Sequence, residues 1–441
     1  MSAALDRVGT IQLVSRDNYI SSEFAAKEKQ NLWSRVWQVA CRVEEVPNPG
    51  DFVVYDVADD TIIVTRNKSG AIVAYHNVCP HRGRRLAVGC GHTNQFRCNY
   101  HGWTFNLDGK NVAVQDRDDW KGGLDDQEID LQHVKVDTWG GFVWINMDPK
   151  CETLKEYLEK IPEYLDPYEY ENMRFRWYVT AHINCNWKVA LEAFMEGYHV
   201  AATHPQLLPI QGDDYTQSYA HGKHAFFGYW ESKIPMGMPS PRLKQEWPKD
   251  PRDGVYRFFE IYDEQLKAIF TDRDCAAGMK IKDAVPDTVD AMTAFVTAVE
   301  MGRKAAEDEG CGYPKGLSWE HLAKAGADWH VFPNCVTLPW FDGALWYRAR
   351  PDGDNPDKCI FDIWSLQRYS PGKEPKLERK VLTDVSGKSV GSLILDQDIA
   401  NMEQVQRGMK SRAFTMARPN PLQEVEVINF HRTLERYLQG R

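Results

Sequence analysis

Hydrophobic and polar positions alternate between residues 51 and 77 in the manner typical of β-strands. The runs DFVVYDV, TIIVTRN and AIVAYHN are rich in β-branched and aromatic residues, and short polar turns separate them. Residues 133–148 read as two further short strands around a Gly-Gly turn. These patterns predict a small all-β domain over residues 41–150.

The hydrophobic period changes near residue 151, where apolar residues begin to recur at helical spacing. Beyond this point the sequence predicts helices at 186–200, 286–308, 394–410 and 422–438, and strands at 329–338, 343–350 and 358–369. This mixture indicates an α+β fold, with a larger second domain over residues 151–441. We expect residues 1–40, which include a helical stretch, to pack on that larger domain.

Charge and composition exclude several classes of function. The 441 residues include 53 Lys and Arg against 63 Asp and Glu, a net charge of −10, which disfavours nucleic acid as a partner. No apolar run approaches the roughly 20 residues of a membrane span, and the first residues lack the apolar core of a secretory signal. We therefore expect a cytoplasmic protein that binds no membrane.

The ten cysteines point to a metal centre rather than to disulfides, because this chain is long and its cysteines are mostly scattered. Two short segments, Cys79-Pro-His81 and Cys98-Asn-Tyr-His101, each offer one thiolate and one imidazole. Four such ligands could hold zinc, or a [2Fe–2S] cluster with both cysteines on one iron and both histidines on the other. The alternating order favours the cluster. We interpret Cys90-Gly-His92 as loop, because it lies too close to Cys98.

A second group of chemistry-bearing residues follows near position 190. On a helix, Glu192, Glu196 and His199 share one face, and His204 follows five residues after His199. Both histidines reach one metal only if the helix is distorted or ends there, which Pro205 makes plausible. Two histidines and one carboxylate form the ligand set of non-haem Fe(II) oxygenases.

The third ligand of such a site is sought near the C-terminus. Asp398 falls with Met402, Val405 and Met409 on an apolar helix stripe, where a carboxylate is costly unless it is paired or bound to metal. Asp396 lies on a more solvated face. We therefore favour Asp398 over Asp396.

The segment CPHRG…CNYHGWTFNLDG resembles the Rieske motif, and with the second group the whole chain resembles the catalytic α subunit of a Rieske non-haem iron ring-hydroxylating oxygenase. The resemblance implies a Rieske domain and a helix-grip-like catalytic domain with an antiparallel sheet. It implies a [2Fe–2S] cluster and a mononuclear Fe(II). The implied cluster ligands are Cys79, His81, Cys98 and His101, and the implied iron ligands are His199, His204 and Asp398.

The resemblance also implies a trimer, α₃ or α₃β₃, in which Glu196 links His199 to His101 of the partner subunit. Aspartate is common at the position of Glu196, and many members have asparagine where this chain has Ala193. Because of these departures, the resemblance implies neither the bridge geometry of an aspartate nor a role for that asparagine in this chain.

The implied activity needs partner proteins. NADPH or NADH reduces a flavin reductase, which passes electrons to the cluster directly or through a ferredoxin, and the reduced iron activates O₂ beside an organic substrate. This chain has no Gly-x-Gly-x-x-Gly motif after a strand, consistent with a partner that binds the nicotinamide. An aromatic or bulky apolar substrate, as in aromatic hydrocarbon catabolism, is the family default. A monooxygenase or demethylase acting on a non-aromatic substrate, and a simple electron carrier, are the alternatives.

Overall fold

The computed structural model describes residues 11–440, and the chain forms two compact units. One unit comprises residues 26–158, and the other combines residues 159–439 with the N-terminal residues up to 25. The domain boundaries expected at residues 40 and 150 stay predictions from the sequence. Among helices of the described part of the chain, none is both long and apolar enough to cross a membrane.

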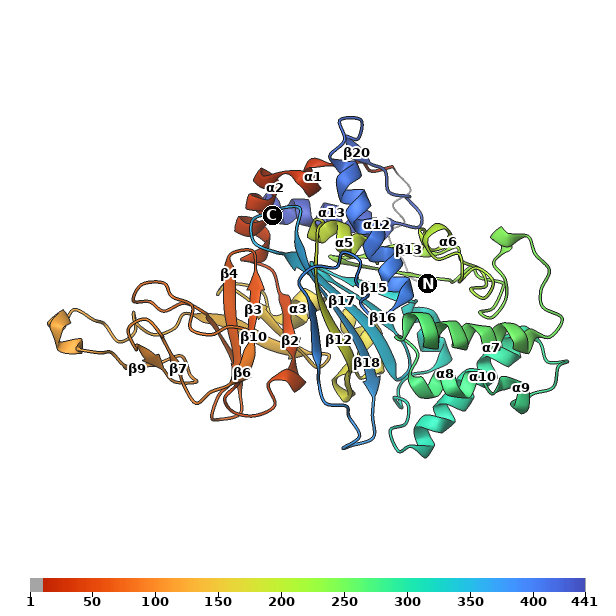
Figure 1. The fold of residues 1–441 in the computed structure, drawn as a ribbon, viewed down its shortest axis with the longest axis horizontal. Helices are drawn as coiled ribbons and strands as arrows, with labels where there is room; N and C mark the ends of the chain where they lie inside the picture. Colours follow the sequence, from red (N-terminus) through yellow and green to blue (C-terminus); the bar gives the residue numbers. More distant parts are fainter. Residues whose placement is uncertain (1–10, 441) are drawn as a thin grey trace. The chain divides into compact units, whose positions relative to one another are not determined.

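Strands form most of the regular secondary structure in the unit of residues 26–158 (Figure 1). Within the described residues, seven strands form one sheet in the order β2-β11-β10-β5-β4-β3-β6, and three short strands form another in the order β7-β8-β9. The strands expected within 51–77 and 133–148 are confirmed as antiparallel neighbours. The bounds are β2 (Gln38–Arg42), β3 (Asp51–Val57), β4 (Asp60–Arg66), β5 (Ile72–His76), β6 (Cys90–His92), β7 (Phe96–Arg97), β8 (Thr104–Phe105), β9 (Asn111–Ala113), β10 (His133–Trp139) and β11 (Phe142–Asn146).

The core of this unit extends to the two Cys-His segments. Cys79 and Cys98 lie in one apolar cluster with Ile63, Tyr75 and Trp103 among its buried members. The loop after Cys79 is fixed by the buried side chain of Asn77, which donates to the carbonyl of residue 87 and accepts from the amides of residues 86 and 87. A rigid β-framework therefore holds the Cys79 loop.

The second unit is built on one large sheet. Among residues 11–440, eight strands follow the order β13-β14-β15-β16-β17-β18-β12-β19, and only the pair β12-β19 is parallel. The bounds are β12 (Met173–Ile183), β13 (Gln217–His221), β14 (His224–Gly228), β15 (Asp328–Val331), β16 (Cys335–Pro339), β17 (Gly343–Pro351), β18 (Cys359–Arg368) and β19 (Arg379–Leu382). The short strands β1 (Val14–Ser15) and β20 (Met416–Ala417) pair separately.

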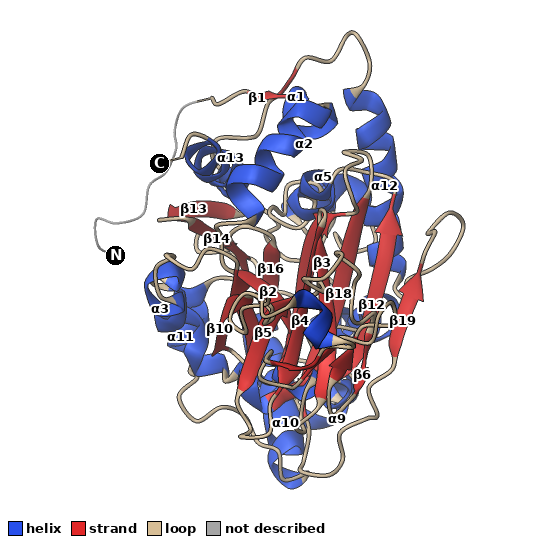
Figure 2. Ribbon diagram, turned by 90° about the vertical axis from the view of Figure 1, so that its left-hand side faces the viewer, coloured by secondary structure: helices blue, strands red, loops and turns tan. Residues whose placement is uncertain are grey.

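Helices surround this sheet (Figure 2). Helix α5 packs on β17 and β18, α12 packs on α5, and α13 packs on β13 and β14, whereas α7, α8 and α10 pack on one another. The helices of this unit among residues 11–440 are α1 (Asp17–Ile20), α4 (Ile161–Leu165), α5 (Trp187–Glu192), α6 (Val200–Thr203), α7 (Pro251–Ile261), α8 (Asp272–Gly278), α9 (Ile281–Ala284), α10 (Ala291–Asp308), α11 (Trp319–Ala325), α12 (Leu393–Met409) and α13 (Val425–Leu438). Helix α2 (Ser22–Glu28) spans the boundary between the units, and α3 (Leu154–Leu158) belongs to the unit of residues 26–158. The expected α+β class with an antiparallel catalytic sheet is confirmed.

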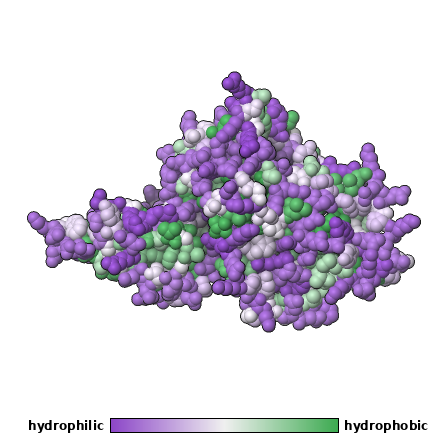
Figure 3. All heavy atoms as spheres, in the orientation of Figure 1, coloured by the Kyte–Doolittle hydropathy of each residue, from purple (hydrophilic) through white to green (hydrophobic). Residues whose placement is uncertain are grey.

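The sequence predictions for residues 329–338 and 154–165 need correction. The strand expected at 329–338 is a hairpin, because residues 332–334 turn the chain between β15 and β16. The apolar stripe at 154–165 forms two short helices, separated at Glu159, whose φ of +51° is incompatible with a continuous helix. The face shown in Figure 3 is mostly hydrophilic, with small separate hydrophobic areas.

Candidate functional site

Helix α5 follows the long strand β12, and the side chain of Asn186 caps its N-terminus. The side chain of Asn186 accepts a hydrogen bond from the amide of Lys188, and the helix ends at Glu192 rather than near 200. The predicted continuous helix over 186–200 is therefore wrong. Residues 193–199 form an irregular connection to α6, and Tyr198, expected in the apolar stripe, is 51% exposed.

The two glutamates that would have shared a helix face point to different partners. Glu196 turns back on its own segment, where its Oε2 accepts from the His199 amide at 2.9 Å and its Oε1 lies 2.7 Å from the His199 Nδ1. Glu192 instead accepts from the Tyr19 hydroxyl at 2.9 Å and contacts His431 at 2.8 Å. Only Glu196 therefore orients a histidine that the sequence assigns to iron.

The second histidine is oriented from a distant helix. His204 ends α6, and its Nδ1 lies 2.8 Å from Oε1 of Gln397 on α12. The carboxylate oxygen can only accept at His199 and the amide oxygen can only accept at His204, so both rings carry hydrogen at Nδ1. Both Nε2 atoms are thereby left as free electron-pair donors, and both face Asp398.

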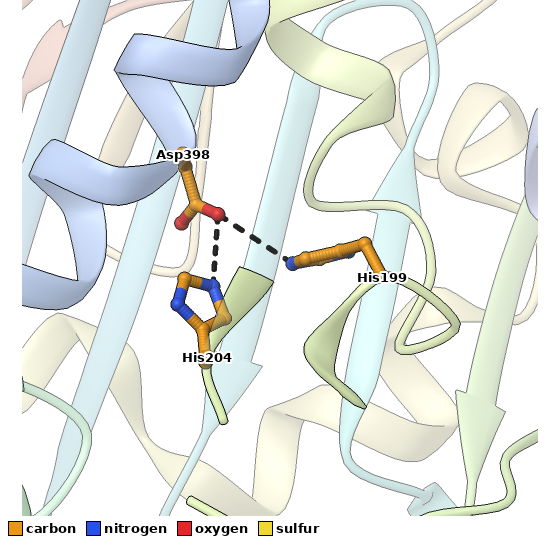
Figure 4. A group of neighbouring side chains, drawn as sticks. All are labelled: His199, His204 and Asp398. Atoms are coloured by element: carbon orange, nitrogen blue, oxygen red, sulfur yellow. Dashed lines mark ion pairs between the residues drawn. The ribbon is translucent and has the colours of Figure 1, made fainter. Parts of the chain in front are cut away.

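Three donor atoms converge from these segments (Figure 4). Asp398 Oδ1 lies 2.9 Å from His204 Nε2 and 3.5 Å from His199 Nε2, and one donor atom from each residue lies within 4.8 Å of the others. Asp398 is 4% exposed, as its place on the apolar stripe of α12 predicts. The carboxylate of Asp396 instead accepts hydrogen bonds from the hydroxyl of Ser389 and the amide of Val390. The structure thus brings His199, His204 and Asp398 together and leaves Asp396 out.

The electrostatics of this group favour a cation. Burial alone would lower the pKa of His199, but the hydrogen bond and charge of Glu196, with the charge of Asp398, outweigh it and raise that pKa. Two imidazoles and one carboxylate that bind one face of a metal ion form the ligand set of a non-haem iron, and the opposite face keeps open positions for other ligands. These three residues therefore fit a mononuclear iron.

A cavity of about 520 Å³ opens directly onto the same three residues. Its wall is mainly apolar and aromatic, and it includes the side chains of Phe194, Phe227, Trp230, Phe270, Phe295 and Trp340. Such a cavity can hold an organic molecule against the grouped donors and away from bulk water. The segment 329–345 contributes Leu338, Pro339, Trp340 and Leu345 to this wall, whereas the other aromatic residues named above come from segments distant from it in the sequence.

The Cys-His segments of the other unit form two loops of the same construction. In each, the amide four residues after the cysteine donates to the cysteine carbonyl at 2.9 Å, and the cysteine amide donates to the carbonyl five residues on. The fourth position is Gly83 in one loop and Gly102 in the other, with φ of +75° and +73°, where glycine is the favoured residue. This repeat brings the His81 and His101 rings to 4.5 Å between centroids.

The four residues of these loops fit an iron–sulfur cluster. Burial and the adjacent Cys98 thiol raise the pKa of Cys79 to about 11, so the thiolate form requires a bound cation. Burial and the positive charges of the neighbouring His101 and Arg82 lower the pKa of His81, which favours the neutral ring that a metal ligand needs. The Nδ1 of His101 is buried without a hydrogen-bond partner among residues 11–440, as expected for an atom that binds metal.

The remaining Cys-x-His sequence is separate from these loops. Cys90 is exposed and lies on β6, and the ring of His92 contacts Asp51 at 2.9 Å. The interpretation of Cys90-Gly-His92 as loop is wrong, because these residues form strand β6 and pair with β3, although they lie outside the two Cys-His loops.

Comparison with protein families decides the assignment. The model described as the ring hydroxylating alpha subunit (catalytic domain) matches residues 170–440, and the Rieske [2Fe-2S] domain model matches residues 36–124. The chain belongs to the ring-hydroxylating alpha subunit family. This alpha subunit therefore carries a Rieske [2Fe–2S] domain and a non-haem iron catalytic domain, and the zinc alternative is excluded. Which side chains bind each cofactor stays a prediction.

Individual relatives share part of this alpha subunit. The glycine betaine monooxygenase oxygenase subunit of Pseudomonas aeruginosa (strain UCBPP-PA14) is 30% identical over 226 residues, covering 49% of this chain and 52% of that protein. The carnitine monooxygenase oxygenase subunit of Escherichia coli (strain K12) is 29% identical over 223 residues, covering 48% and 56%. The chain thus spans about half the length of the curated relatives it matches.

Solved structures extend the likeness in fold to nearly the whole alpha subunit. The quaternary ammonium Rieske monooxygenase CntA in complex with L-carnitine superposes with a TM-score of 0.66 at 17% identity, covering 97% of this chain and 96% of that one. Naphthalene 1,2-dioxygenase from Rhodococcus sp. bound to indole gives 0.64 at 19%, covering 97% and 95%. At these identities the comparison establishes a shared fold alone.

Proposed function

We propose that this chain is the terminal oxygenase component of a Rieske non-haem iron oxygenase that hydroxylates an organic substrate. The observation that carries the proposal is the convergence of His199, His204 and Asp398 on one side of a largely apolar cavity of about 520 Å³. This geometry places three metal donors at the wall of a space large enough for a substrate. A chain that served only as an electron carrier would need neither feature.

The cofactors have natural ligands in this chain. We assign the Rieske cluster to Cys79, His81, Cys98 and His101, and the mononuclear Fe(II) to His199, His204 and Asp398. When bound, the cluster supplies single electrons and the iron activates O₂. The residues themselves fix the site: Glu196 and Gln397 each hold a histidine ring so that its Nε2 faces Asp398. The aromatic wall excludes water from the space beside them.

Glu196 is proposed to connect the two centres between subunits of a trimer. Its carboxylate lines the main cavity and also a second cavity of about 360 Å³. The second cavity is lined by His199 and Asp398 as well, and by residues such as Arg418 and Pro419 that do not line the main cavity. Contact between Glu196 and His101 of the partner subunit requires that the carboxylate be accessible from a side other than the substrate cavity, and the second cavity provides this access. The mass of the purified assembly distinguishes an α₃ trimer from an α₃β₃ assembly.

The substrate is proposed to be an aromatic or bulky apolar molecule, because most of the cavity wall is apolar and aromatic. The relatives named as glycine betaine and carnitine monooxygenases support a second candidate, monooxygenation or demethylation of a non-aromatic amine. We further propose that an NAD(P)H-dependent flavin reductase, with or without a ferredoxin, supplies electrons in the cytoplasm.

The substitution Asp398→Ala tests the proposed iron site. We expect the iron content to fall from about three to about two atoms per chain, because the mononuclear metal loses its carboxylate while the cluster keeps its ligands. The visible absorption of the cluster should be unchanged, and turnover with a surrogate reductase should disappear. Iron analysis and O₂ consumption across a panel of aromatic and amine substrates measure both effects.

Asp396→Ala is the matched control, because Asp396 lies on the same helix two residues away and contacts Ser389 instead of the histidines. It should keep its iron and its turnover. Full turnover by Asp398→Ala, or a wild-type protein without the red-brown colour of a cluster, would contradict the proposed function.

A further inference from the structure

One wall of the main cavity carries an acidic side chain that is not among the grouped metal donors. Asp328 begins β15, pairs with Phe227 of β14 and is fully buried at 0% exposed. It lines the cavity, and among residues 11–440 its carboxyl group meets another acid, Glu426, rather than a cation or an N–H donor. A buried carboxylate without a cation or an N–H donor is costly, so its presence at a binding surface calls for a ligand.

A second acid lies behind Asp328. Glu426 comes from the first turn of α13, is also 0% exposed, and contacts Asp328 carboxyl to carboxyl. Burial raises the pKa of both groups, and two carboxyl groups in contact share a proton instead of both ionising. Glu426 does not line the cavity, so Asp328 is the member of the pair that meets a bound molecule.

The surroundings of Asp328 leave its charge uncompensated. No lysine or arginine lines the cavity in the described part of the chain. The wall instead presents aromatic residues, including Phe227, Trp230 and Trp319, and aromatic faces attract cations. A positively charged group with N–H donors would satisfy the carboxylate and interact favourably with the aromatic wall, whereas a neutral hydrocarbon would contact the wall and leave the carboxylate without a partner.

We propose that Asp328, supported by Glu426, binds a protonated amine on the substrate of this oxygenase. The inference deepens the proposed function, on which it rests for taking the cavity as the substrate site. The substrate would then combine an apolar skeleton, held by the aromatic wall, with one ammonium group held by Asp328. Asp328 would determine specificity and has no part in holding the iron.

Binding of three small probes to the holoenzyme tests this proposal without turnover. Indane, 2-indanol and 2-aminoindane share one ring skeleton. Indane carries no polar group, 2-indanol carries a neutral hydroxyl, and 2-aminoindane carries an amine that is protonated near pH 7. Isothermal titration calorimetry, without reductant, gives their affinities. We expect 2-aminoindane to bind roughly tenfold or more tightly than the other two, since a hydrogen bond to a charged group contributes more than a neutral one.

Two substitutions separate recognition from structure. Asp328→Asn, which preserves shape and removes the charge, should abolish the preference for the amine and leave the affinity for indane unchanged. Glu426→Gln is the matched control, because it removes the other acid and leaves Asp328 able to accept a hydrogen bond from the new amide. It should retain the preference. The visible absorption of the cluster and the melting temperature report the integrity of each variant.

Equal affinities of the wild type for all three probes, absence of binding of any of them, or a preference for the alcohol alone would overturn the proposal. So would equal losses of amine binding in Asp328→Asn and Glu426→Gln, because that result would indicate a structural role for the pair. A protein that keeps the amine preference but loses neither iron nor turnover in Asp398→Ala would overturn the proposed function alone.

Discussion

The chemistry of the candidate iron site depends on which nitrogen each histidine presents. Glu196 fixes the His199 ring within its own turn, and Gln397 fixes the His204 ring from α12. The oxygen of Gln397 also accepts a hydrogen bond from Gln206 at 2.8 Å. Partners behind the ligands of a metal site commonly set ring orientation and metal affinity. Gln397 is therefore a positioning residue next to the ligand Asp398.

Replacing Gln397 by leucine should weaken mononuclear iron binding by roughly 10- to 100-fold, because the His204 Nδ1 loses its acceptor and the ring its fixed orientation. Iron titration of the metal-depleted protein measures the affinity, and the visible absorption of the cluster should stay unchanged. Gln206→Leu serves as the control, since it removes a bond to Gln397 and leaves the bond to His204 intact. Equal iron affinity in Gln397→Leu and wild type would contradict the positioning role.

The site residues that could be predicted from the sequence are those whose spacing by itself indicates metal binding. Cys79, His81, Cys98 and His101 repeat one short pattern, and Asp398 stands out as a charge on an apolar helix stripe. Gln397 was passed over because a glutamine between two aspartates carries no such signal. Asp328 and Glu426 lie almost 100 residues apart, and only the packing of α13 near β15 reveals that they meet.

At the scale of elements, the connection between α5 and α6 carries Glu196 and His199 and passes close to the sheet. A Cβ atom on Gly197 would lie 2.8 Å from the Cγ2 of Thr216, which is fully buried and has little room to move. Glycine at this position therefore allows the close approach on which the iron site depends.

Gly197→Ala should destabilise the protein by about 1–3 kcal/mol and reduce its mononuclear iron, because the added methyl group overpacks the contact with Thr216. Adding Thr216→Ser, which removes Cγ2, should restore both properties. Thermal unfolding and iron analysis give the readouts. Gly408→Ala on α12 is the control, since a Cβ there meets nothing within 4 Å and should be neutral or stabilising. Failure of Thr216→Ser to rescue Gly197→Ala would refute the steric explanation.

Elements with a clear period were predicted well, such as β3, β4, β10 and α12. The helix over 186–200 failed because apolar periodicity continues through Phe194 and Tyr198, whereas the chain turns at Glu196 to satisfy the His199 amide. Strand β14 was missed because it is buried along its whole length and lacks alternation. Strand β12 was missed although its first residues alternate between apolar and polar.

At the scale of the whole molecule, the trimer proposal predicts complementation between two inactive variants. His101→Ala should lack a functional cluster but retain its mononuclear iron, and Asp398→Ala should show the reverse. Each homotrimer is expected to be inactive. If electrons pass from one subunit to the next, random co-assembly at equal amounts would create competent neighbouring pairs at about a quarter of all interfaces.

Co-expression with two different affinity tags, followed by tandem purification, isolates the mixed trimers for O₂-consumption assays. Turnover restored towards about a third of the wild-type rate is the expected result, because in each purified mixed trimer one of the three interfaces joins an intact cluster on one chain to intact iron on the next. Mixing the two finished homotrimers without exchange of subunits is the control and should stay inactive. Electron transfer confined within single chains would leave the mixed trimers as inactive as their parents, and would remove the reason for placing Glu196 at a subunit boundary.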